Sequence, residues 1–171
     1  MRFLILLSFC FAIVSCNNKP QQKEETSADS SKSNSLTEAD IAELKYLDFA
    51  LDPKAEVLAE PWQPYYRLKT TIENIKKADF SFFEEDEQAI FVLVKELRNT
   101  IPDTLKTQSV LSRITIVENM LYKLDETYKL RTTSKPELTT STKQLLEAYS
   151  NLNFQLNKKL EKDSQEIARP D

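Results

Sequence analysis

The chain of 171 residues contains no glycine. Glycine supplies the positive φ angles used in tight β-hairpins, β-bulges and phosphate-binding loops. Its absence therefore argues against a β-rich fold and against a nucleotide-binding loop. Hydrophobic residues make up 40% of the sequence and charged residues 29%, values that are usual for a folded globular protein. The composition favours a folded domain built from helices.

From Ser35 onward, apolar residues recur at spacings of three and four, the period of an amphipathic helix. Helices are predicted from Ser35 to Leu51, from about Glu60 to Ile75, and from about Phe83 to Asn99. A short turn through Leu58 separates the first two. The most regular stripe follows these helices and consists of Val110, Ile114, Val117, Leu121, Leu124 and Tyr128.

Helix-capping patterns support these boundaries. Ser35-Leu36-Thr37-Glu38 and Ser134-Lys135-Pro136-Glu137 both fit a capping box, and the second has proline in its first turn. Thr107 is a possible cap of the fourth helix. The fifth helix follows Ser134 and places Leu145, Tyr149, Leu152, Leu156 and Leu160 on one side.

Four or five amphipathic helices with short connections bury their apolar stripes best in an antiparallel bundle. A long coiled coil is the competing interpretation, because an apolar seam is also its mark. Pro102 and Pro136 interrupt the helices, and these breaks favour the compact bundle. The predicted fold is thus an all-α antiparallel bundle.

The first 15 residues have the features of an export signal. Arg2 is followed by an apolar run from Phe3 to Val14, broken only by Ser8, and by the small residue Ser15. This run is too short for an ordinary membrane span, which needs about 20 apolar residues.

Ile13-Val14-Ser15-Cys16 resembles the lipobox of bacterial lipoproteins. The resemblance implies that residues 1–15 are removed and that Cys16 receives a diacylglycerol group. Apart from this covalent lipid, no cofactor is expected. Two or more acyl chains hold a protein stably at a membrane. Gln22-Lys23-Glu24-Glu25 resembles the surface-export signal of flavobacterial lipoproteins, and Asn17 favours the outer membrane by analogy. Whether the domain faces the periplasm or the cell surface stays open.

These features divide the chain into three parts. Residues 1–15 are the predicted signal peptide, and residues 16–34 are the lipidated cysteine and a tether. The tether contains no aromatic or large aliphatic residue after Cys16, so it is expected to be disordered. Residues 35–171 form the predicted helical domain.

The sequence excludes most catalytic and metal chemistry. It contains no histidine, and Cys16 is the only cysteine left after removal of the leader. Histidine-based zinc, haem and di-iron sites and Ser-His or Cys-His nucleophiles are therefore absent. Glu84-Glu85-Asp86-Glu87 is interpreted as a dipole-stabilising first helical turn rather than as a cation site. No metal site and no enzymatic activity are expected.

The segment from Glu60 to Arg67 has the most unusual composition in the domain. It contains Trp62, Tyr65 and Tyr66, and aromatic residues with polar groups are enriched at recognition surfaces. The same residues also serve to pack the core or close the end of a bundle. Both interpretations stay open, and the three aromatic residues are candidate contacts for a partner.

The function expected from the sequence is a membrane-tethered, non-enzymatic envelope lipoprotein whose helical domain binds another envelope protein. The alternative is a carrier of a small apolar ligand in the bundle. The net charge is −4, so neither nucleic acid nor anionic lipid is an expected partner of the protein surface. The membrane is contacted through the lipid anchor.

Overall fold

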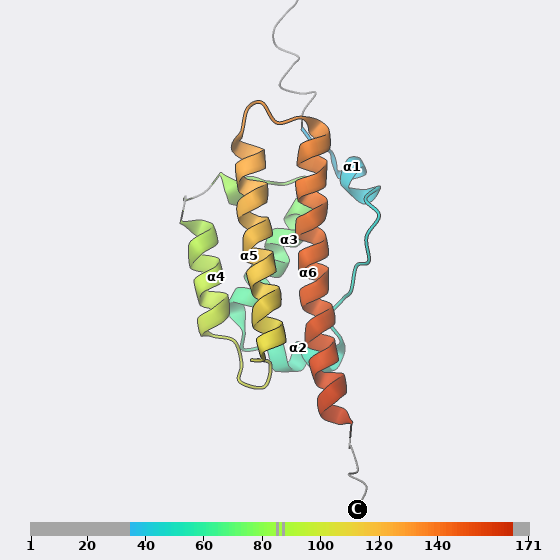
Figure 1. Ribbon diagram of the computed structural model, residues 1–171, viewed down its shortest axis with the longest axis vertical. Coiled ribbons are helices and arrows are strands. Elements are labelled where there is room, and N and C mark those ends of the chain that lie inside the picture. The colour runs from blue at the N-terminus through green and yellow to red at the C-terminus, as the bar shows by residue number, and fades with distance from the viewer. Residues whose placement is uncertain (1–34, 85, 87, 166–171) are drawn as a thin grey trace, which may run out of the picture. The chain divides into compact units, whose positions relative to one another are not determined.

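The computed structural model describes residues 35–84, 86 and 88–165, and this part of the chain is all-helical, with no strand (Figure 1). The predicted all-α bundle is confirmed. The predicted leader, Cys16 and tether lie outside the described residues. The elements are α1 (Glu38–Ala42), α2 (Pro53–Ala59), α3 (Gln63–Lys76), the 3-10 helix η1 (Ser81–Phe83), α4 (Ala89–Asn99), α5 (Gln108–Lys129) and α6 (Lys135–Ser164).

The two longest helices, α5 and α6, form an antiparallel hairpin at the centre of the bundle (Figure 1). Thr107 caps α5 by accepting a hydrogen bond from the Val110 amide at 3.3 Å. Ser134 and Glu137 form the predicted capping box of α6, with Pro136 in the first turn. These caps satisfy amide groups that a helix N-terminus leaves without a partner.

The predicted stripe of α5 faces the core. Its first five residues are at most 1% exposed, and only Tyr128 is half-buried. α4 packs against α5, and α1 and α2 pack against α6, while α3 contacts α1, α4 and α6. One contiguous apolar cluster joins them.

The predicted first helix is too long. α1 ends at Ala42, and residues 44–52 run without helical structure along α6 (Figure 1). We call residues 44–52 the strap. Its apolar residues have helical spacing, but Leu47 is 75% exposed. Side chains of α6 provide hydrogen-bond partners for the strap main chain, and these bonds take the place of helical ones.

The predicted start of α4 is also wrong. The helix begins at Ala89, and its first turn contains no acidic residue. Glu84 and Asp86 therefore lie outside the first turn of α4, which contradicts their interpretation as dipole-stabilising residues of that turn, and Glu85 and Glu87 lie outside the described residues. Glu84 instead accepts a hydrogen bond from the Tyr128 hydroxyl at 2.6 Å. Burial and this carboxylate raise the pKa of Tyr128 to about 12.

The chain leaves α3 through a left-handed residue that is not glycine. Ala78 has φ of 60°, and it is the only described residue with positive φ. The Asp79 amide donates to the Asn74 carbonyl at 3.0 Å, which closes the end of the helix. This reversal directs the chain into η1, which lies beside α3.

The cap of α1 gives a prediction on acid stability. Asp40 accepts hydrogen bonds from Lys135 and Thr37, and these lower its pKa from 3.8 to about 2. A lowered pKa stabilises the fold above the unfolded value and loses that stabilisation as the pH falls through the folded value. Thermal melting from about pH 5 to pH 2 should show Asp40→Asn melting below the native chain at the higher pH, with the gap closing toward the lower. A gap that stays constant would contradict this role of Asp40.

Candidate interaction groove

The aromatic residues predicted as partner contacts lie mostly in the core. Trp62 is 0% exposed and Tyr65 1% exposed. The Trp62 indole donates to the Leu97 carbonyl at 3.1 Å, and the Tyr65 hydroxyl donates to Asn153 Oδ1 at 3.0 Å. Neither side chain offers a surface to a partner, so for these two residues the core interpretation holds and the binding interpretation does not.

The structure places Tyr66 differently. Its side chain is half-buried, and its hydroxyl lies 3.5 Å from the Glu56 carbonyl. The ring of Tyr66 stands edge-on to Tyr65, with 5.4 Å between the ring centroids. Tyr66 thus connects the buried aromatic residues to a groove on the surface.

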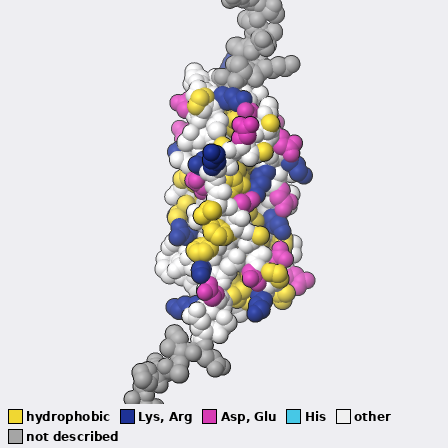
Figure 2. All heavy atoms as spheres, turned by 90° about the vertical axis from the view of Figure 1, so that its right-hand side faces the viewer, with side chains coloured by type: hydrophobic (Ala, Val, Ile, Leu, Met, Phe, Trp, Pro, Cys, Tyr) yellow, Lys and Arg dark blue, Asp and Glu magenta, His cyan; other side chains and the backbone are white. Residues whose placement is uncertain are grey.

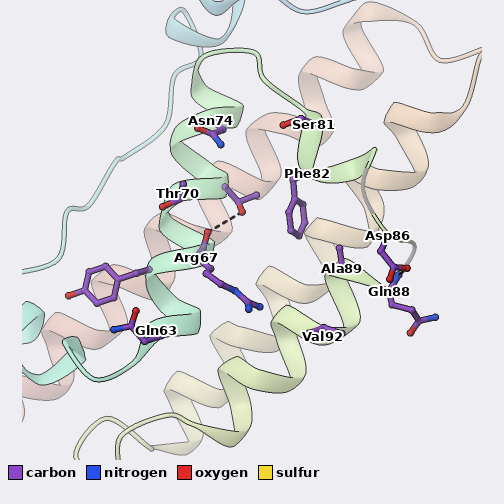
Figure 3. A pocket seen from close by; sticks show the side chains of 12 residues that line it. Gln63, Arg67, Thr70, Asn74, Ser81, Phe82, Asp86, Gln88, Ala89 and Val92 are labelled. Atoms are coloured by element: carbon purple, nitrogen blue, oxygen red, sulfur yellow. Dashed lines mark hydrogen bonds between the residues drawn. The ribbon is translucent and has the colours of Figure 1, made fainter.

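This groove lies between α3 and α4, with η1 beside it, and its volume is about 670 Å³ (Figure 3). We call it the α3–α4 groove. Its lining residues come from α3, from η1, from the turn before α4 and from the first turns of α4. They are Gln63, Tyr66, Arg67, Thr70, Thr71, Asn74, Ser81, Phe82, Asp86, Gln88, Ala89 and Val92.

The lining combines a small apolar centre with uncharged polar groups. Phe82 points from η1 into the space between α3 and α4, and Ala89 and Val92 lie on the α4 side (Figure 3). Gln63 and Asn74 contribute amide groups from α3. Amides can both donate and accept hydrogen bonds, so this lining suits a ligand with alternating polar and apolar groups.

The charged groups of the groove are already engaged within the protein. Arg67 pairs with Glu96 at 2.9 Å, which joins α3 to α4. The Thr71 hydroxyl donates to the Arg67 carbonyl at 3.0 Å, the bond drawn in Figure 3. Asp86 accepts the Gln88 amide at 2.9 Å. The groove therefore presents no unpaired arginine for an anionic ligand.

Nothing in the groove assembles a nucleophile with a general base, as acyl transfer would require. Within residues 35–84, 86 and 88–165, no group of three or more His, Cys, Asp or Glu residues could hold a metal ion. No helix in this described part is both long and apolar enough to cross a membrane.

Sequence reasoning missed this groove because its central residue is placed by tertiary structure. Phe82 reaches the groove only because the chain reverses at Ala78 and forms η1. One signal was present: Phe80, Phe82 and Phe83 fall within four residues. Residues three apart share a helix face and residues two apart do not, so Phe82 could not lie on the same face as Phe80 and Phe83. Phe80 and Phe83 are buried and pack near Tyr128, which leaves Phe82 on the other side.

Comparison of the chain with protein-family models, with curated protein sequences and with solved structures gave no match.

Proposed function

We propose that the protein is a lipid-anchored component of the cell envelope, held through Cys16 at the outer membrane, and that its helical domain binds a partner protein in the α3–α4 groove without catalysis. The observation that carries the proposal is the groove itself. It is open to solvent and has an apolar centre between amide and hydroxyl groups.

The groove continues into an exposed apolar surface on α4. Phe91 is 51% exposed and Val92 41% exposed, and Lys95 lies over the Phe91 ring at 5.7 Å from its centroid. Adjacent exposed apolar side chains are typical of protein contacts. A polypeptide could cover Phe91 and Val92 while its main chain bonds to Gln63 and Asn74.

The alternative, a carrier of a small apolar ligand in the bundle, has less support. The inward stripe of α5 is fully packed. The α3–α4 groove lies outside this core, and most of its lining residues are polar or charged. Pockets for apolar ligands are lined predominantly by apolar side chains.

Site-specific photo-crosslinking in intact cells tests the groove. A photoreactive phenylalanine analogue replaces Gln63 or Ser81, which are exposed and line the groove from α3 and from η1. The control position is Asn151, which is exposed on α6 and does not line the groove. Both groove positions should give a discrete adduct that the control position lacks.

A matched pair of charge substitutions sharpens this test. Val92→Arg places a charge in the groove, whereas Ile116→Arg places one at an equally exposed position on α5. The adduct should disappear with Val92→Arg and persist with Ile116→Arg. Adducts that form equally at all positions, or that survive Val92→Arg, would contradict binding in the groove.

The anchor is tested separately. Cys16→Ser should abolish labelling by a fatty-acid analogue and release the protein from the membrane fraction, because the thiol is the acceptor in the proposed lipidation. Cys10, the other cysteine of the sequence, lies within the predicted leader and is not expected to replace Cys16. Labelling that persists in Cys16→Ser would refute the anchor and would leave the groove proposal to its own test.

A further inference from the structure

The connection between α5 and α6 carries an exposed leucine among cationic residues. Leu130 is 56% exposed at the end of α5, and Arg131 beside it is exposed as well. From Lys129 to Lys135 the sequence has three cationic residues and no acidic one. We call residues 129–135 the α5–α6 turn. Exposed apolar side chains flanked by cationic ones are typical of contacts with a membrane surface.

This turn lies at the end of the bundle where the described chain begins. The described chain starts at Ser35, and α1 follows it beside the first turn of α6 (Figure 1). Asp40 of α1 pairs with Lys135 at 2.8 Å. The residues that precede Ser35, which include the proposed anchor Cys16, therefore join the domain next to the α5–α6 turn.

The opposite end of the bundle lies a helix length away. α6 contains 30 residues, which at a rise of about 1.5 Å per residue gives about 45 Å. α2 and the start of α5 lie at that far end (Figure 1). A lipid attached at Cys16 thus brings the α5–α6 turn closer to a bilayer than it brings α2.

A pocket begins at the α5–α6 turn and continues between the last turns of α5 and the first turns of α6. Its volume is about 540 Å³. Leu130 lines it together with the hydroxyl groups of Thr127, Thr140 and Ser141. Hydroxyl groups can both donate and accept hydrogen bonds, so they suit the phosphate and ammonium groups of a lipid headgroup.

The charged side chains of this pocket have both signs. Lys123 and Glu126 line it, and within the described part of the chain neither forms an ion pair. The second acidic residue of the lining, Glu137, is engaged in the capping box of α6, where it accepts the Ser134 amide at 2.8 Å. One available cation and one available anion match a zwitterionic headgroup.

The side of the bundle offers a bilayer a less suitable surface. Figure 2 views the molecule from the side on which α1 lies in Figure 1, and it shows hydrophobic side chains among charged side chains of both signs. Attraction of a flat protein face to a membrane relies on clustered Lys and Arg residues. The face in Figure 2 has no such field, so contact at the end of the bundle is favoured.

We propose that the α5–α6 turn contacts the phospholipid bilayer to which the protein is anchored. Leu130 enters the interface, Arg131 binds lipid phosphate, and the neighbouring pocket receives a zwitterionic headgroup. Guanidinium groups bind phosphate through charge-assisted hydrogen bonds. In this orientation the α2 end of the bundle points away from the membrane. This contact depends on the lipid anchor of the proposed function.

The anchor makes a small contact sufficient. One leucine and one arginine alone would give only weak, reversible membrane binding. Attachment through Cys16 places the turn at an effective concentration in about the millimolar range, as a short linker does for a second binding event. The net charge of −4 opposes the contact little, because salt screens charges that lie more than about 10 Å away.

Quenching of a fluorophore by labelled lipid tests the contact on the full lipidated chain. The fluorophore is attached to Thr132→Cys in the turn or to Val57→Cys, an exposed position on α2. In the proposed mature protein Cys10 is removed and Cys16 carries lipid, so the introduced cysteine is the only free thiol. The vesicles consist of phosphatidylethanolamine and phosphatidylglycerol, and part of the lipid carries a nitroxide quencher on its headgroup.

The fluorophore at position 132 should be quenched several times more strongly than the fluorophore at position 57. Equal quenching of protein that is recovered with the vesicles would refute the contact and leave the anchor intact. Protein that stays out of the vesicle fraction and takes the label at Cys16 would refute the anchor, and the contact with it.

Two matched pairs of variants assign the contact to its residues, with the fluorophore kept at position 132. Leu130→Asp should reduce the quenching several-fold, whereas Leu47→Asp, at an exposed position of the strap, should leave it unchanged. Arg131→Gln should reduce it more than Lys106→Gln, because these two exposed cations lie at opposite ends of α5. Equal effects within either pair would show that the turn does not hold the bundle on the bilayer.

Discussion

Trp62→Ala is expected to lower the free energy of unfolding by about 3–5 kcal/mol. The indole is fully buried, stacks on Tyr65 with 5.4 Å between ring centroids, and joins α3 to α4 through the Leu97 carbonyl. Alanine removes all three contributions and leaves a cavity. Because Trp62 is the only tryptophan, unfolding has to be followed by far-UV circular dichroism rather than by tryptophan fluorescence.

Two variants control this measurement. Tyr122→Ala removes an aromatic ring from an exposed position on α5 and should cost well under about 1 kcal/mol. Trp62→Phe keeps most of the apolar surface and loses the donor to Leu97, so it should cost about 1–3 kcal/mol. If Trp62→Ala costs no more than Tyr122→Ala, the indole does not hold α3 to α4.

The second large effect is expected for Leu121→Ala, at about 2–5 kcal/mol. Leu121 is 0% exposed in the middle of the α5 stripe, where truncation loses apolar burial and leaves a cavity. A typical domain is stable by only about 5–15 kcal/mol, so this single change removes a large share of the total. Equilibrium unfolding in urea gives the value directly.

Ile116→Ala is the matched control for Leu121→Ala. Ile116 lies on the same helix at 39% exposure, so its truncation should cost less than about 1 kcal/mol. Glu118 is a poorer control, because its carboxylate accepts a hydrogen bond from Arg98 on α4 at 2.7 Å. Similar costs at Leu121 and Ile116 would mean that the stripe is not the inner face of the bundle.

Local signals in the sequence predicted the central hairpin well. Val110, Ile114, Val117, Leu121 and Leu124 repeat without interruption and are all buried. Thr107 and Ser134 cap α5 and α6 as predicted. Both signals act within one or two helical turns, so they can be recognised from neighbouring residues alone.

The strap could not be predicted in the same way. Leu44, Leu47 and Leu51 have helical spacing, yet Leu47 points to solvent and the other two are only half-buried. The conformation is decided by Ser150, Asn153 and Asn157 of α6, which lie far away in the sequence. Their hydrogen bonds to the main chain of the strap replace the helical ones. Nothing in residues 44–52 alone indicates these partners.

The candidate site was predicted only in part. Residues 60–67 were recognised as unusual, but composition could not distinguish aromatic residues of the core from those of a surface. Trp62 and Tyr65 are buried because α4 and α6 cover them, and Tyr66 remains at the edge of the α3–α4 groove. The position of Phe82 depends on the reversal at Ala78, for which a glycine would have been the usual signal.

The contacts of the strap have a consequence for the order of folding. Its bonds to α6 join residues that are 101 to 107 positions apart, whereas the hairpin of α5 and α6 needs only local contacts. Closing a long loop costs entropy before the contact stabilises anything. The strap therefore docks after the hairpin has formed. During synthesis the strap is made about a hundred residues before α6, so its hydrogen-bond partners on α6 do not yet exist when it leaves the ribosome.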